Sequence, residues 1–212
     1  MPKNTFFNLD IQKQETITRE SISEFARKGF DKGNIEIIAK KSKVAKGSMY
    51  QYFENKRDLY VHSVSCALDI TMGDIQIVLD NRKEEDLCDF LFKSFQAVWP
   101  LLRKERDSFL LLRNVNFEAD ILLRDELKSM VSAASEDVFL KIIEEDQSRG
   151  RIRSDIDSRT ILLFIDGISA RFKSHILEIA LRDGKDILDA SFAEYEKLLA
   201  DMMSLIRNAL AR

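Results

Sequence analysis

The sequence predicts an all-α protein, and three observations lead to this prediction. The 212 residues include only seven glycines and two prolines, so turn-forming residues are too scarce for a protein of many short strands. Apolar side chains recur at spacings of three and four over long stretches, which is the repeat of an amphipathic helix. Apolar residues make up 45% of the chain and charged residues 33%, the balance of a globular protein with a sizeable core. The pattern indicates about nine helices.

The spacing of apolar residues and the position of two glycines predict the first two helices. Residues 11–28 form the first, because apolar or small residues recur there at i, i+3, i+4 and i+7: Ile22, Phe25, Ala26 and Gly29. Gly29 and Gly33 then interrupt the pattern. Asn34 is expected to cap a second helix that ends near Ser42, since its side-chain oxygen can accept a hydrogen bond from an orphan backbone N–H.

A third short helix is expected from Lys46 to Phe53, after a tight turn around Lys43 and Val44. Met49 and Phe53 are four residues apart and should face inward. Lys46, Gly47 and Tyr50 then face outward. Three helices with the last two joined by a tight turn form a helix-turn-helix unit.

Six longer helices are expected in the remainder, over about residues 56–80, 86–99, 104–115, 120–148, 158–181 and 185–211. Pro100 should stop or kink the helix over residues 86–99, because proline removes a helical donor and clashes with the preceding turn. A loop is expected around Gly150.

The small net charge of −3 conceals an asymmetry. Residues 1–60 carry 12 lysines and arginines against 8 acids, and the remaining 152 residues carry 21 against 28. Within residues 40–57, six basic residues are opposed only by Glu54. Such a cluster suits a surface that binds a polyanion, because bound phosphates release their counterions. The alternative is a solvated helix face.

The N-terminal stretch resembles the tetracycline-repressor (TetR) family of bacterial transcription regulators. The resemblance covers about residues 11–60 and rests on an ordered set of residues: Ile17, Phe25, Gly29, Phe30, Ile38-Ala39, Lys46-Gly47-Ser48-Met49-Tyr50, Phe53, Asn55-Lys56 and Leu59. It implies a three-helix DNA-binding head, residues 1–57, and a larger helical ligand-binding and dimerisation body, residues 58–212. It also implies a homodimeric repressor that a small, largely apolar ligand releases from a palindromic operator.

The resemblance also implies which residues contact DNA. The family's base-contacting positions match Ala45, Lys46, Gly47 and Ser48, and its phosphate-contacting positions match Asn34, Tyr50, Tyr52 and Lys56. Lysine can reach a guanine edge or a phosphate, and serine can bond to either type of base. Lys56 would add its charge to the donors at the start of the fourth helix.

Three positions depart from the family's pattern. Lys43 stands at a turn position where many members have glycine, and Ala45 stands where a serine or threonine caps the recognition helix. A non-glycine in a left-handed turn is strained by about 1 kcal/mol, and losing the cap costs about as much. Glu36 occupies a position of the second helix where a basic or polar residue often meets DNA.

Aromatic residues in the fifth to seventh helices suggest a ligand pocket. The candidate lining is Phe92, Phe95, Trp99, Phe109 and Phe117, with Arg113 and Asn116 as polar groups. This set suits an apolar ligand with an anionic or hydrogen-bonding end. Aromatic residues at helical spacing can equally be ordinary core.

The last two helices carry long apolar stripes. Their expected dimer-interface residues are Ile161, Ile165, Ile168, Phe172 and Ile176 in one helix, and Phe192, Tyr195, Leu199 and Met202 in the other. Additional apolar positions widen the stripes beyond what one neighbouring helix covers, so we expect the pair to form a four-helix bundle with a second copy. In the alternative, the pair packs on its own body.

Other functional classes have weaker support in the sequence. His62 and His175 are far apart, and no phosphate loop, nucleophile motif or metal-ligand cluster accompanies them, so neither an enzyme nor a cofactor is expected. Cys66 and Cys88 could sense oxidants, but buried inert thiols are the simpler interpretation. The chain start lacks a signal peptide and no apolar run could cross a bilayer, which favours a cytoplasmic protein without a membrane partner. A helical protein-interaction module with a basic head remains the alternative function.

Overall fold

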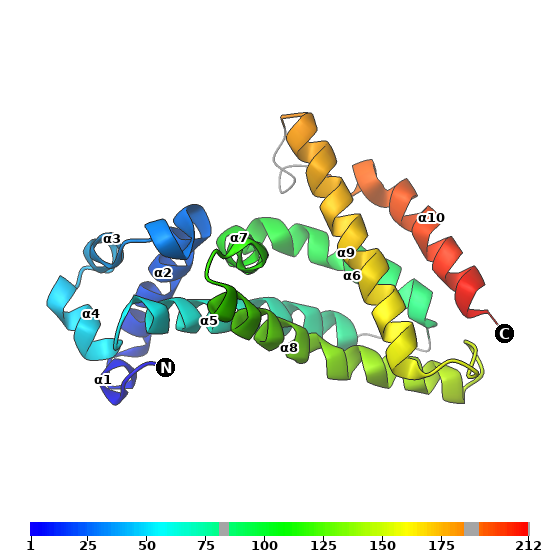
Figure 1. Ribbon diagram of the computed structural model, residues 1–212, viewed down its shortest axis with the longest axis horizontal. Helices are drawn as coiled ribbons and strands as arrows, with labels where there is room; N and C mark the ends of the chain where they lie inside the picture. Colours follow the sequence, from blue (N-terminus) through cyan, green and yellow to red (C-terminus); the bar gives the residue numbers. More distant parts are fainter. Residues whose placement is uncertain (81–84, 185–190, 212) are drawn as a thin grey trace. The chain divides into compact units, whose positions relative to one another are not determined.

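The computed structural model describes residues 1–80, 85–184 and 191–211, and this part of the chain is helical throughout, with no strand (Figure 1). The predicted all-α class is confirmed. The helices are α1 (Asn4–Phe7), α2 (Ile11–Lys32), α3 (Ile35–Lys41), α4 (Lys46–Tyr52), α5 (Lys56–Asp80), α6 (Leu87–Lys104), α7 (Arg106–Asn114), the 3-10 turn η1 (Val115–Phe117), α8 (Ile121–Ser148), α9 (Ser158–Arg182) and α10 (Ala193–Leu210).

The chain divides into two compact units. The first unit contains residues 1–73 and 105–132, and the second contains residues 74–104 and 133–212. Residue 57, where we expected the head to end, lies inside the first unit at the start of α5. The first unit therefore also includes α7 and the beginning of α8.

The core of the first unit is rich in aromatic rings. Phe25 of α2 packs edge-on against Tyr60 of α5, with ring centroids 4.9 Å apart, and both side chains are fully buried. Helix α7 lies against α2, where the side-chain amide of Asn114 donates to the carbonyl oxygen of Ala26 at 2.8 Å. These contacts fix α2 and α5, on which the small helices α3 and α4 rest.

Helix α2 begins and bends where its sequence dictates. The Asp10 carboxylate accepts a hydrogen bond from the Lys13 N–H at 2.8 Å and so caps the helix. Gly29 adopts φ 68°, a left-handed conformation that favours glycine, and interrupts the helix where the sequence predicted its end. Gly33 follows in a tight site, because a Cβ there would lie 2.5 Å from the Phe25 ring.

In the second unit, α6 packs against α10. Trp99 of α6 contacts the rings of Phe192 and Tyr195, with centroid distances of 5.9 and 5.4 Å. Pro100 was expected to stop or kink the helix, and it does not stop it, because α6 continues to Lys104. An internal proline costs about 3 kcal/mol, and the burial of the neighbouring Trp99 against α10 favours the helical path despite that cost.

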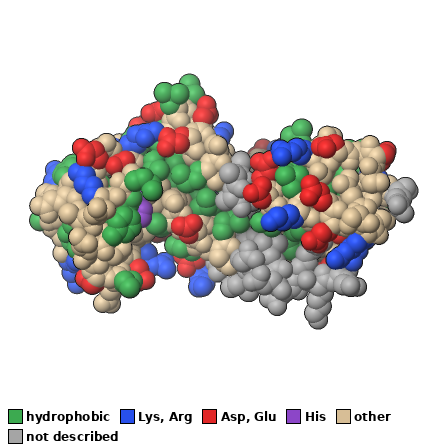
Figure 2. Space-filling view, turned by 90° about the horizontal axis from the view of Figure 1, so that it is seen from below, with side chains coloured by type: hydrophobic (Ala, Val, Ile, Leu, Met, Phe, Trp, Pro, Cys, Tyr) green, Lys and Arg blue, Asp and Glu red, His purple; other side chains and the backbone are tan. Residues whose placement is uncertain are grey.

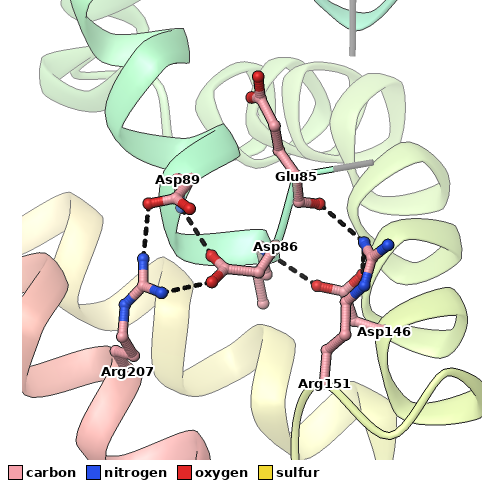
Figure 3. Close-up of polar contacts among 7 residues, drawn as sticks. Glu85, Asp86, Asp89, Asp146, Arg151 and Arg207 are labelled. Carbon is pink, nitrogen blue, oxygen red and sulfur yellow. Dashed lines mark hydrogen bonds and ion pairs between the residues drawn. The ribbon is translucent and has the colours of Figure 1, made fainter. Parts of the chain in front are cut away.

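A buried carboxylate holds the start of α6 (Figure 3). Asp146 of α8 is fully buried and accepts a hydrogen bond from the Leu87 N–H at 2.7 Å, which satisfies one orphan donor of α6. Arg151 lies 3.4 Å from the same carboxylate and donates to the backbone carbonyl of Glu85 at 2.9 Å. The N-terminus of α6 is therefore tied to the end of α8.

A second set of contacts ties α6 to α10. The Arg207 guanidinium of α10 pairs with the carboxylate of Asp86 and lies 2.6 Å from that of Asp89 (Figure 3). Asp86 also caps the helix through a 2.9 Å hydrogen bond from the Asp89 N–H. The two networks give α6 partners on both α8 and α10.

The first and last helices of the described chain differ from the sequence-based expectation. Helix α1 was not predicted from the sequence; its Phe6 is buried in the core of the first unit. The predicted last helix over residues 185–211 is described from Ala193 to Leu210, and residues 185–190 lie outside the described part of the chain.

The surface mixes both signs of charge. On the face shown in Figure 2, lysines and arginines alternate with acids, and hydrophobic side chains reach the surface between them. Within the described ranges, none of the helices combines the length and the hydropathy that a membrane span requires.

Candidate nucleic-acid interface

Helix α4 buries one face and exposes the other. Met49 and Phe53 are almost fully buried, whereas Tyr50 keeps 46% of its surface exposed. Lys46 and Gly47 are also exposed, and a Cβ added to Gly47 would meet nothing within 4 Å. The inward and outward faces predicted from the helical repeat are confirmed.

The turn between α3 and α4 closes with two backbone hydrogen bonds. The Val44 N–H donates to the Ala39 carbonyl at 2.9 Å, and the Lys43 N–H donates to the Lys40 carbonyl at 3.1 Å. This pairing is a Schellman motif, whose residue after the C-cap is usually glycine. Here that residue is Lys43 with φ 54°, so the predicted left-handed lysine is confirmed.

The two short helices begin differently. Asn34 accepts a hydrogen bond from the Glu36 N–H at 2.8 Å, which confirms it as the cap of α3. Ala45 at the start of α4 has extended backbone geometry but makes no side-chain cap bond. The first N–H groups of α4 are therefore left without a side-chain acceptor from the cap residue.

An open depression of about 550 Å³ lies between the start of α3 and the outer face of α4. Its lining consists of Asp31, Lys32, Gly33, Asn34, Ile35, Glu36, Lys46, Tyr50, Asn55 and Lys56. Four residues expected to contact DNA therefore share one surface, and Glu36 lies among them.

Lys56 has contacts of its own within this depression. Its ammonium group donates to the backbone carbonyls of Asp31 at 2.9 Å and Gly33 at 3.3 Å. It also lies 4.8 Å from the centre of the Phe30 ring, a cation–π contact. Lys56 thus ties the start of α5 to the link between α2 and α3 while its charge stays at the depression.

The remaining four expected DNA residues surround this surface without lining the depression. Ala45 and Gly47 are exposed and Ser48 is half-buried. Tyr52 is also half-buried, and its ring packs against Phe6 with the centroids 6.3 Å apart. Its aromatic ring is therefore in contact with the core of the first unit.

The N-terminal segment is attached to the end of α4, which sequence reasoning missed. Lys3 donates from its backbone N–H to the Tyr52 carbonyl at 2.8 Å and from its ammonium group to the Tyr50 carbonyl at 3.1 Å. The Thr5 hydroxyl donates to the Gln51 carbonyl. Three carbonyls that a helix end leaves unpaired are thus satisfied from outside.

His62 and Cys66 belong to the core and not to a reactive site. The His62 ring lies between Phe6 and Phe53, with centroids 5.2 and 5.5 Å away, and burial lowers its pKa to about 4. Burial raises the pKa of Cys66, and likewise that of Cys88, to about 11, so both thiols stay protonated at neutral pH. Across the described residues, no three His, Cys, Asp or Glu side chains are grouped in a way that could hold a metal ion.

The expected ligand-pocket residues fall in both units. Phe92, Phe95 and Trp99 lie on α6, where they contact the rings of Phe192, Phe172 and Tyr195. Phe109, Arg113 and Asn116 lie in the first unit; Arg113 and Asn116 are exposed, and the Asn116 amide donates to the Arg113 carbonyl at 3.4 Å. The side chain of Phe117 lies outside the described residues.

Most of the expected dimer-interface residues are buried within the chain itself. Less than a tenth of the surface is exposed in Ile161, Ile165, Phe172, Ile176, Tyr195 and Leu199, whereas Ile168, Phe192 and Met202 are half-buried. Other apolar side chains of the same helices are open to solvent: Leu163 is 73% exposed, Phe164 42% and Leu205 69%. Both α9 and α10 thus present large apolar side chains to solvent.

A helix-turn-helix head whose second helix is exposed is an arrangement that many DNA-binding transcription regulators share. Residues 17–62 match the family model of the bacterial regulatory proteins of the tetR family. The negative regulator IcaR of the Staphylococcus aureus biofilm operon icaADBC is 23% identical over 154 residues, which cover 72% of this chain and 80% of that protein. Residues 17–62 are thus similar to the corresponding segment of tetR-family regulators, and IcaR is similar over most of the chain.

Solved structures agree with the fold. A TetR-family regulator from Chloroflexus aurantiacus covers 100% of this chain and 99% of its own length, with a TM-score of 0.67 and 20% identity. The regulator FadR of Bacillus subtilis, solved with stearoyl-CoA, covers 91% of this chain and 96% of its own length, with a TM-score of 0.66 and 19% identity.

Proposed function

We propose that two copies of the chain bind a palindromic operator through α4 and that a small, largely apolar ligand releases them, so that the protein acts as a repressor. The exposed outer face of α4 is the observation that carries the proposal. Tyr50 and Lys46 project from a helix whose inner face is locked into the core by Met49 and Phe53. Such a helix fits the major groove with its first turn at the base edges.

The surrounding contacts support a phosphate-binding role for the rim. Asn34 and Lys56 border the depression that Lys46 and Tyr50 also line. A lysine and an amide beside a groove-entering helix can contact phosphates and fix its register on the duplex without reading sequence. IcaR is named a negative transcriptional regulator, which supports repression as the outcome.

Variants of the exposed face test the proposal. Lys46→Ala and Tyr50→Ala should each abolish specific binding to a duplex selected from a random pool by the wild-type chain, which leaves only the weak affinity for a scrambled duplex. The melting temperature should change little, because both side chains are largely exposed. Lys128→Ala, an exposed lysine of α8, is the matched control and should bind normally. Normal binding by the Lys46 and Tyr50 variants would contradict the assignment of the site.

We propose that the copies meet through the outward faces of α9 and α10. The apolar side chains Leu163, Phe164 and Leu205 support this, since single exposed leucines are common but an extended apolar face marks an interface. Ile168 and Met202 are the half-buried members of the sequence-predicted set that can join them. In this arrangement, the buried apolar residues of α9 and α10 stabilise each subunit. The exposed apolar residues of the same helices join two subunits.

A charged substitution separates these two roles. Phe164→Glu should give monomers in sedimentation measurements and weaken operator binding, because two linked heads bind more tightly than one. Leu122→Glu is the control, since Leu122 on α8 is 80% exposed and belongs to the other unit. A dimer that survives Phe164→Glu would place the interface elsewhere.

The ligand can be followed through the single tryptophan of the chain. Trp99 is buried beside Phe192 and Tyr195, and the half-buried Phe92 and Phe95 lie on the same helix. FadR is similar in fold and was solved with stearoyl-CoA, so stearoyl-CoA is the first compound to titrate. A saturable change in tryptophan emission together with release of DNA would support an apolar acyl ligand. Release without any change in emission would place the ligand away from α6.

A further inference from the structure

An ion pair spans the depression between α3 and α4. The Lys46 ammonium group donates to Glu36 Oε2 at 3.0 Å, and the two side chains are 56% and 64% exposed. Both residues line the depression. The hydrogen bond to Glu36 raises the pKa of Lys46, so the lysine remains charged at neutral pH.

This pair contributes little to the stability of the fold. Exposed ion pairs gain little Coulomb energy in water and lose side-chain entropy, so most have small effects. The pair also opens readily for the same reason. The pair instead changes the charge of the surface, because Glu36 of α3 neutralises the charge of Lys46, the first residue of α4.

The chemistry of the pair matches a base pair better than a phosphate. A phosphate presents only acceptors and a negative charge, which Glu36 repels. The major-groove edge of a G·C pair presents two adjacent acceptors, guanine N7 and O6, followed by the N4 amino donor of cytosine. The Lys46 ammonium group can donate to guanine N7 and O6, and the adjacent Glu36 carboxylate can accept from the cytosine N4 amino group. In an A·T pair the donor stands between two acceptors, which fits the pair less well.

We propose that Glu36 and Lys46 act as one unit, which reads a G·C pair in each operator half-site and keeps Lys46 away from the phosphates of other sequences. This inference rests on the proposed function, in which α4 enters the major groove. It makes Glu36 a specificity-determining residue, although its charge opposes DNA binding in general.

The first experiment compares affinities for a selected duplex and a scrambled duplex of the same length. Glu36→Gln keeps the shape of the side chain and removes its charge, which frees Lys46 for a phosphate. One added phosphate contact per subunit makes two in the dimer, which should steepen the dependence of log K on log salt by about 1.8 and strengthen scrambled-duplex binding roughly sixtyfold at 0.1 M salt. Affinity for the selected duplex should rise less, so the ratio of the two affinities should fall roughly threefold or more.

The second experiment repeats the selection from a random pool with each protein. Sequences selected by wild type should contain a fixed G·C pair at one position of each half-site. Those selected by Glu36→Gln should be degenerate at that position and unchanged elsewhere. A position that remains G·C in the variant would overturn the assignment of Glu36 to base reading.

Two controls test whether the effect of Glu36→Gln depends on the contact between Glu36 and Lys46. Glu20 forms a comparable ion pair with Lys41 at 3.6 Å outside the depression, so Glu20→Gln should leave the ratio of affinities unchanged. In a Lys46→Ala background, Glu36→Gln should no longer steepen the dependence of log K on log salt for the scrambled duplex, because no lysine is freed to contact a phosphate. An equal gain in both backgrounds would mean that Glu36 acts by net charge alone, which overturns the proposal. Failure of the wild type to bind any duplex would instead contradict the proposed function itself.

Discussion

The backbone N–H of Lys3 donates to the carbonyl oxygen of Tyr52 at 2.8 Å, and this bond joins the N-terminal segment to the last turn of α4. The end of a short helix frays unless its carbonyls find donors. Because Thr5 supplies a further donor to the same turn, the segment stabilises the helix whose opposite end carries Lys46. The geometry of the candidate interface thus depends on residues far from it in sequence.

Removing one of these donors should weaken the head. We expect Thr5→Val to lower the free energy of unfolding by about 1 kcal/mol, because it deletes the hydrogen bond to the Gln51 carbonyl. Operator affinity should fall as well, since the end of α4 becomes less ordered. Thr16→Val is the matched control, because the Thr16 hydroxyl bonds only within α2, to the Gln12 carbonyl at 2.7 Å. Denaturant unfolding and DNA titration of both variants check the prediction, and equal effects would contradict it.

The sequence predicted the helix-turn-helix in detail because local signals agree there. Asn34 marks the start of α3, Gly29 marks the interruption within α2, and the spacing of Met49 and Phe53 assigns the faces of α4. Helix α1 was missed because four residues are too short to show a helical period, and its contacts come from α4 and the core. Pro100 does not stop α6, because a local preference can be overridden by tertiary packing.

Contacts between helices could not be predicted in the same way. The Glu36–Lys46 pair joins residues ten positions apart, and its formation depends on how α3 and α4 are oriented. The apolar stripes of α9 and α10 were recognised, but periodicity alone does not say which apolar face packs on the chain itself. Ile165 and Phe172 are buried inside, while Leu163 is exposed on the same helix.

Lys43 offers a test of backbone strain. Its φ of 54° is unfavourable for a residue with a Cβ, and glycine removes that cost. Lys43→Gly should therefore raise the free energy of unfolding by about 1 kcal/mol. Lys40→Gly should lower it by a similar amount, because Lys40 lies within α3, where glycine is unfavourable. Thermal unfolding of the two variants should shift in opposite directions, and a shift in the same direction would show that the turn is not strained.

His62 should make stability depend on pH. Burial lowers its pKa to about 4, whereas an unfolded histidine titrates near 6.5, so the unfolded state binds more protons between these values. Stability is therefore full above pH 6.5 and is lost as the pH falls toward 4, by about 2 kcal/mol between pH 7 and pH 5. His62→Leu should flatten the profile over that range. His175→Gln, at a half-exposed position of α9, should retain it. Parallel profiles for wild type and His62→Leu would assign the pH dependence to other groups.

Replacing Asp146 should lower the free energy of unfolding of the second unit. It is fully buried, accepts from the Leu87 N–H and faces Arg151, so Asp146→Asn removes a charge that the arginine and the start of α6 both use. We expect a loss of about 2 kcal/mol in the free energy of unfolding. Asp155→Asn is the matched control, because Asp155 pairs with Arg153 at 2.7 Å on the surface and should matter little.

Hydrogen exchange locates the effect of Asp146→Asn. The amides at the beginning of α6 should exchange faster in Asp146→Asn and at the wild-type rate in Asp155→Asn, because only Asp146 accepts from the Leu87 N–H. Trp99 lies three turns further along α6, so its emission should change little if the loosening is confined to the helix start. Unchanged exchange at Leu87 in Asp146→Asn would show that packing against α10, with Arg207 on Asp86 and Asp89, is enough to hold the helix in place.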